Sequence, residues 1–110
     1  MNAPFDEFVF PEPWWDLRGN GQREGEQRDR LVRRLRTETG DGHPLSTRSV
    51  EAIAAFTRQD EILYRLDGGQ EFLFAHLTYT SNPPDPYISL RFFSSWEDAA
   101  AMVDEMAEMW

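Results

Sequence analysis

The alternation of apolar and polar positions in the second half of the chain predicts a β-sheet. β-Branched and apolar residues are concentrated in 48–57, which is expected to form a first strand. Residues 61–66 alternate in the manner of a second strand. The Asp67–Gly68–Gly69 sequence that follows is a hairpin signal, because its glycines permit positive φ. A third strand is expected over 71–80, where both faces are largely apolar, which indicates a central strand covered on both sides.

A fourth strand is expected over 87–93. Ile88, Leu90 and Phe92 form its core face, while Ser89 and Arg91 lie on the other face. The preceding sequence SNPPDP, residues 81–86, is expected to form a rigid loop, because its prolines exclude regular structure. Short connections of this kind favour a four-stranded antiparallel meander.

Two helices complete the predicted fold. Residues 22–39 have a narrow apolar stripe of Leu31, Val32 and Leu35, and glycines and a proline follow. After Phe93, Ser94 and Glu97 form a capping box for a C-terminal helix with apolar residues at helical spacing. The sequence therefore predicts an α+β fold in which the four-stranded meander is flanked by an N-terminal Arg-rich helix and a C-terminal amphipathic helix.

The first 20 residues have a different character. They contain three prolines and five aromatic residues, which favours an extended arm over a helix or a central strand. We refer to residues 1–20 as the arm and expect 21–110 to form a single α+β domain. The aromatic rings of the arm could pack over their own domain or across a subunit boundary. Trp14 and Trp15 are therefore candidate interface residues.

Composition limits the class of protein. The chain has 110 residues and no cysteine, which excludes a disulfide framework and cysteine-based metal sites. It has neither a long apolar run nor a signal-peptide pattern. We therefore expect a soluble cytoplasmic protein that does not associate with a membrane.

Charge is distributed unevenly along the chain. The net charge is −9, but the run RDRLVRRLR, residues 28–36, carries +4, so the remainder carries −13. Such an acidic remainder repels nucleic acid, and an acidic protein surface is a better partner for this helix. Arg30, Arg33 and Arg34 are the candidate interface residues here. All 11 basic residues are arginine. Either codon usage or a need for bidentate guanidinium contacts explains this composition.

Several motifs between residues 42 and 98 resemble those of a family of small bacterial proteins without an assigned function. The motifs are Gly42–His43–Pro44–Leu45, DEILYRLDGG (60–69), AHLTY (75–79), Pro84–Asp85–Pro86 and Ser95–Trp96–Glu97. The chain has Tyr79 where the family pattern has tryptophan, and Glu61 where an aspartate is common. The resemblance supports the meander and implies no catalytic residue.

Candidate chemistry is sparse. The two histidines, His43 and His76, lie in no metal-binding pattern, so we predict no metal site, no cofactor and no catalytic residue. A polar sheet face could nevertheless hold an anionic ligand, if the strand register brings its groups together. The candidate ligand-binding residues are His76, Thr78, Tyr79, Asp85 and Arg91.

The sequence favours a non-enzymatic protein-interaction or regulatory module that self-associates, with a homodimer as one form. The features behind this interpretation are the aromatic arm and the charge segregation. The alternative is a small-ligand-binding protein or an enzyme that uses the polar face of His76 and Arg91.

Overall fold

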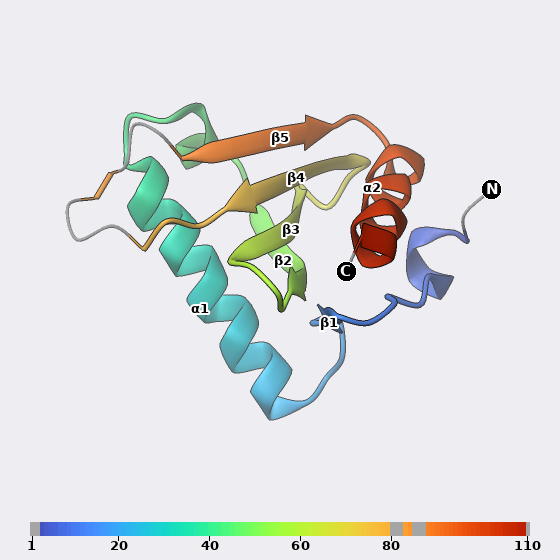
Figure 1. Cartoon of the computed structure of the whole chain (residues 1–110). Coiled ribbons are helices and arrows are strands. Elements are labelled where there is room, and N and C mark those ends of the chain that lie inside the picture. Colours follow the sequence, from blue (N-terminus) through green and yellow to red (C-terminus); the bar gives the residue numbers. More distant parts are fainter. Residues whose placement is uncertain (1–2, 80–82, 85–87, 110) are drawn as a thin grey trace.

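The structure is a computed structural model that describes residues 3–79, 83–84 and 88–109. Figure 1 shows the helices and strands in chain order. They are the 3₁₀ turn η1 (Phe5–Glu7), β1 (Trp14–Asp16), α1 (Gln22–Thr39), the 3₁₀ turn η2 (Pro44–Thr47), β2 (Val50–Phe56), β3 (Glu61–Leu66), β4 (Glu71–His76), β5 (Ser89–Phe93) and α2 (Trp96–Met109). The fold class is α+β, as predicted.

The strands form one antiparallel sheet in the order β1-β2-β3-β4-β5 within the described residues. The prediction of four strands was therefore one short, because part of the arm adds an edge strand. Trp14 pairs with Phe56 and Asp16 with Ala54. Pro13 has no N–H to donate, but its carbonyl oxygen accepts from the backbone N–H of Thr57 at 3.2 Å. An edge position tolerates this proline where a central strand would not.

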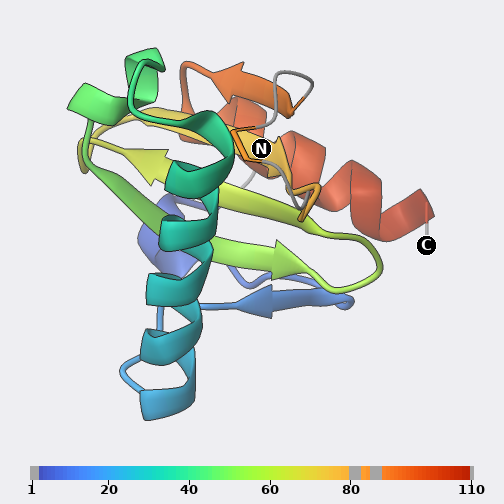
Figure 2. The ribbon, with the colours of Figure 1, turned by 90° about the vertical axis from the view of Figure 1, so that its left-hand side faces the viewer.

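The sheet separates two hydrophobic cores, so the molecule has three layers. Leu31 and Leu35 of α1 pack with Tyr64 and Leu73 on one face of the sheet. The arm and α2 cover the other face, where Phe72 is buried. Figure 2 shows α1 in front of the sheet and α2 behind it. The expectation that β4 is covered on both sides is confirmed.

The arm packs on its own chain. Phe8 and Phe10 point into the core that α2 shares, whereas Val9 between them is 84% exposed. The Phe8 ring meets the ring of Trp96 edge-on, with centroids 5.1 Å apart. The indole N–H of Trp14 donates to the carbonyl oxygen of Val103 in α2 at 3.1 Å. The aromatic rings therefore bury apolar surface within one chain.

Two details near β5 differ from the sequence interpretation. Phe92, expected in the core, is 49% exposed, and Phe93 is buried instead. α1 packs mainly over β2, so its cover does not extend to Phe92 at the opposite edge of the sheet. The cap of α2 is Ser95 and not Ser94, since the Ser95 Oγ accepts from the backbone N–H of Asp98 at 3.2 Å.

The alternation in the arm predicts how it contributes to stability. Phe8→Ala should lower the free energy of unfolding by about 3–5 kcal/mol, because the removed ring leaves a cavity beside Trp96. Val9→Ala, at an exposed position, should change it by less than about 0.5 kcal/mol. Chemical denaturation followed by tryptophan fluorescence measures both. Equal effects of the two substitutions would show that the arm does not pack as described.

Candidate functional site

The strand register places two of the ligand candidates on the same face of the sheet. His76 lies opposite Ser89, and Arg91 lies opposite Phe74, so His76 and Arg91 are diagonal neighbours on adjacent strands. Both side chains are exposed. The Arg91 guanidinium stacks on the ring of Phe93, 4.9 Å from its centroid. The groove that Arg91 lines is formed with α2, and His76 does not take part in it.

His76 has an acidic neighbour across the strands. It lies opposite Glu61 of β3. Partial burial raises the pKa of the Glu61 carboxyl, and the charge of His76 acts against this shift. This pair is a cross-strand surface contact, and in the part of the chain that the structure describes no three histidine, aspartate or glutamate side chains gather to hold a metal ion.

Thr78 and Tyr79 belong to a different cluster, which is built around Glu38. This carboxylate lies in α1 and is completely buried. Its Oε1 accepts from the backbone N–H of Thr78 at 2.8 Å and from the Thr78 hydroxyl at 3.0 Å. Its Oε2 accepts from the backbone N–H of Tyr79 at 3.0 Å and from Nε of Arg34 at 2.7 Å. The cluster ties α1 to the segment that follows β4. Asp85 lies outside the described residues.

Tyr79 has the backbone conformation that this attachment requires. Its φ is 51°, in the left-handed region that non-glycine residues seldom adopt. The Arg34 guanidinium lies 5.0 Å from the centroid of its ring. Arg34, a candidate interface residue, therefore has contacts within its own chain.

Glu38 did not emerge as a candidate from the sequence. Its position three residues after Leu35 continues the apolar stripe of α1, and a carboxylate in such a stripe signals a buried acid with partners elsewhere. Burial alone would raise the pKa of Glu38. The hydrogen bonds from Thr78, Arg34 and Tyr79 outweigh burial, so the pKa lies below its usual value.

The arginines of α1 divide into two groups. Arg28 donates to the carbonyl oxygens of Leu17 and Gly19, and Arg36 donates to those of Leu45 and Arg48. These guanidinium groups hold loops against the helix. The other two interface candidates, Arg30 and Arg33, are exposed. Trp15, also an interface candidate, is half-buried below Arg23, whereas Trp14 lies in the core.

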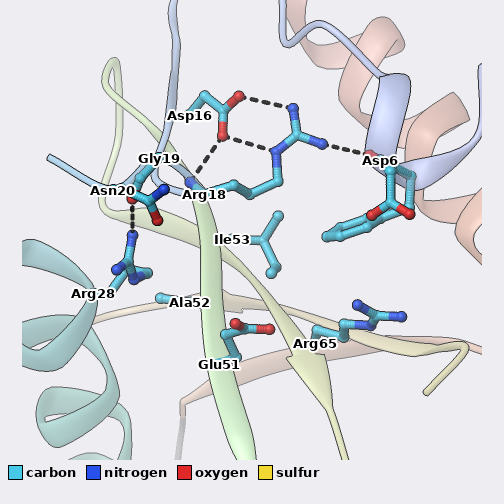
Figure 3. Close-up of a pocket in the computed structure, with 11 residues that line it drawn as sticks. Asp6, Asp16, Arg18, Gly19, Asn20, Arg28, Glu51, Ala52, Ile53 and Arg65 are labelled. Atoms are coloured by element: carbon cyan, nitrogen blue, oxygen red, sulfur yellow. Dashed lines mark hydrogen bonds and ion pairs between the residues drawn. The ribbon is translucent and has the colours of Figure 1, made fainter. Parts of the chain in front are cut away.

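A groove of about 580 Å³ lies between the arm, α1 and strands β2 and β3 (Figure 3). Arg18 crosses its rim and donates through Nε and Nη2 to the two carboxylate oxygens of Asp16. Its Nη1 donates to the carbonyl oxygen of Phe5, and Nη2 also donates to that of Phe8. The hydrogen bonds from Arg18 lower the pKa of Asp16. Arg65 lies over the Phe5 ring. The arginines of this groove therefore hold the arm in place. Glu51, which also lines the groove, is exposed.

A second groove, of about 330 Å³, lies between β5 and α2. The β5 side contributes Arg91, Phe92 and Phe93, and α2 contributes Asp98, Ala101, Met102 and Glu105. α2 contains five carboxylates and no basic residue, and four of the five are exposed. The groove thus combines an apolar floor with an acidic wall. Its charge favours a cationic ligand over the anionic ligand that the sequence suggested for Arg91.

The Glu38 cluster predicts a pH-dependent stability. Glu38→Gln should lower the free energy of unfolding by about 3 kcal/mol near neutral pH, because the amide cannot accept all of these hydrogen bonds and leaves Arg34 without its carboxylate. Since the folded pKa of Glu38 is lowered, this stability is complete above its usual pKa of about 4.3 and is lost as the pH falls through the folded value.

Urea denaturation of both proteins across the acidic range measures this difference. The gap between wild type and Glu38→Gln should narrow as the pH falls. Glu108→Gln changes an exposed residue and should have an effect of less than about 0.5 kcal/mol. A gap that stays constant with pH would contradict the role of the ionised carboxylate.

One structural finding and three comparisons with known proteins bear on the class of this protein. No helix in the described ranges has the length and apolarity needed to cross a membrane. No protein-family model, curated protein or solved structure matches this chain, so the resemblance drawn from its motifs stays a prediction.

Proposed function

We propose that the protein is a non-enzymatic protein-interaction module whose binding surface is the acidic side of α2. The observation that carries this proposal is the set of α2 carboxylates. The helix contains Glu97, Asp98, Asp104, Glu105 and Glu108, with no basic residue among them. They lie next to the groove between β5 and α2, which Phe93 and Met102 line on the α2 face of the sheet.

None of these carboxylates forms an ion pair with another described residue. Within the described ranges, the acidic members of the ion pairs are Asp16, Glu38, Asp67 and Glu71. None of them comes from α2. The acidic side of α2 is therefore free to pair with cations of another protein.

The arrangement is unfavourable for α2 itself. Glu105 and Glu108 are three residues apart on one side of the helix, where like charges repel by about 0.2–0.5 kcal/mol. The last turn contains no basic residue, and negative charge there opposes the helix dipole. Residues that locally destabilise the fold are typical of functional sites. A basic partner would relieve both effects.

Neutralising α2 tests the proposal. Immobilised protein should capture partners from an extract of the source organism, and Asp98→Asn/Glu105→Gln/Glu108→Gln should retain about tenfold less of the same proteins, because their cations lose their counter-charges. The control Glu26→Gln/Asp29→Asn/Asp41→Asn makes the same change in net charge at exposed positions in α1 and the loop that follows it. α1 lies on the opposite face of the sheet from α2. Quantitative mass spectrometry compares the proteins retained by wild type, by the α2 triple variant and by the control variant. Equal retention by both variants would contradict this binding surface.

Self-association is a second candidate, favoured by the exposed Arg30 and Arg33 on α1. α1 and α2 cover opposite faces of the sheet. The basic side of one copy could therefore contact the acidic side of α2 in another copy. Deleting the arm is not a useful test of this contact, because its rings belong to the core.

Sedimentation velocity measures this association. The sedimentation coefficient should rise with protein concentration at low ionic strength and should not rise at about 0.5 M salt, where the Debye length is only a few ångströms. Arg33→Glu should weaken the association, and Arg58→Glu, a matched exposed arginine in the β2–β3 turn, should not. A monomer at every concentration and ionic strength would exclude self-association.

A further inference from the structure

Strand β5 forms a free edge of the sheet. It pairs with β4 on one side, and in the described part of the chain no strand lies on its other side (Figure 1). An edge of this kind can accept a further strand from another molecule.

The hydrogen-bond pattern identifies the backbone groups at this edge. The backbone N–H of Leu77 donates to the carbonyl oxygen of Asp60 at 2.7 Å, which extends the β3–β4 ladder by one pair beyond Glu61 and His76. Hydrogen-bonded pairs alternate along an antiparallel ladder. The backbone groups of His76 therefore point away from β3 and toward Ser89 of β5.

The alternation continues along β5. Ser89, Arg91 and Phe93 direct their backbone groups toward β4, so Leu90 and Phe92 direct theirs outward. Each outward residue offers one N–H and one carbonyl oxygen. Leu90 and Phe92 therefore form a short template for strand addition.

The groove beside this edge selects the side chains of an added strand. Side chains on the α2 face of an added strand would lie beside Arg91, Asp98 and Glu105, near Met102, so the carboxylates outnumber the one guanidinium. Carboxylates there favour Lys or Arg with the stem of the side chain on the apolar floor. Side chains on the opposite face would lie beside Leu90 and the half-exposed Phe92, which favours apolar residues.

We infer that β5 and α2 together bind an extended segment of a partner protein in which basic and apolar residues alternate, and that this segment adds a strand to the β5 edge. The inference rests on the proposed function and adds to it the edge and the chemistry of the partner. The backbone of Leu90 and Phe92 supplies the hydrogen bonds, and the carboxylates of α2 supply the selectivity.

Charge argues against a second copy of this chain as the occupant of the edge. Antiparallel pairing of two β5 strands about a twofold axis places equivalent sheet faces on the same side. Two α2 helices, each with five carboxylates, would then lie on that side. Their repulsion opposes the pairing, whereas a basic segment is attracted by the same charges.

Labelled synthetic peptides of roughly seven residues, a little longer than β5, test the inference. A peptide that alternates Lys with Val should bind, as measured by fluorescence anisotropy. Two control peptides should bind at least about tenfold more weakly: one with Glu in place of Lys, and one of the same composition with all Lys before all Val. Failure of the alternating peptide to bind at about 1 mM would overturn the inference.

Substitutions in β5 separate strand addition from simple charge attraction. Phe92→Pro removes one outward N–H and leaves the β4 ladder intact, so it should weaken binding at least about tenfold. Phe92→Ala removes the ring and keeps the N–H, so it should weaken binding less. Circular dichroism confirms that both variants are folded. Equal binding by wild type and Phe92→Pro would overturn the inference.

Amide hydrogen exchange gives a second readout in the wild-type protein. The amides of Leu90 and Phe92 should exchange quickly in the free protein and slow down when the alternating peptide is added. Those of Arg91 and Phe93 should be slow in both states. No change at Leu90 and Phe92 with bound peptide would exclude strand addition at this edge.

These outcomes are distinguishable from failure of the proposed function. If Phe92→Pro still retains the partners that the α2 triple variant loses, the interaction surface stands and strand addition is wrong. If the protein alone dimerises and Phe92→Pro abolishes the dimer, the edge binds a second copy and the inference of a basic partner is overturned.

Discussion

The sheet is apolar on both faces, and the arrangement of every other element follows from the need to cover it. Phe72 and Leu73 are consecutive in β4 and are buried in different cores. Each buried apolar side chain of this size stabilises the fold by about 1.5–3 kcal/mol, so neither face can be left in water. α1 covers one face. On the other, α2 contacts β4 and β5, and the rings of Phe8 and Phe10 fill the space beside it. This requirement holds the arm on its own chain.

Guanidinium groups satisfy the backbone where the chain is irregular. Arg18, Arg28 and Arg36 each donate to two carbonyl oxygens in the 3₁₀ turns and the connecting segments. The planar fork of arginine suits paired acceptors, which the compact ammonium group of lysine does not match. At these positions the guanidinium geometry is used structurally, so only part of the charge of the basic run faces solvent. The segregation of charge therefore depends more on the acidic α2 than on α1.

Local patterns predicted the elements, and nonlocal contacts account for what was missed. The bounds of α1 and β3 agree with the predicted 22–39 and 61–66, because periodicity and glycine breaks are local signals. β1 was missed because it exists only through its pairing with β2. The Glu38 cluster was missed for the same reason, since its donors lie beyond β4. His76 and Arg91 lie on the same face of the sheet. The groove beside Arg91 was missed because it forms only where α2 packs against β5.

A sheet that is covered on both faces offers recognition only at its edges and on its covering helices. The β1 edge is three residues long and follows Pro13, which has no N–H to offer a further strand. β5 is longer, contains no proline, and lies beside the helix that carries the unpaired carboxylates. Backbone hydrogen bonds at such an edge give affinity for an added strand but do not depend on its sequence. Neighbouring charges select the sequence of that strand but add little affinity. Among the residues that the structure describes, the β5 edge combines an unpaired strand with neighbouring carboxylates. The basic segment that we propose for this edge would relieve the charges that disfavour α2 in isolation.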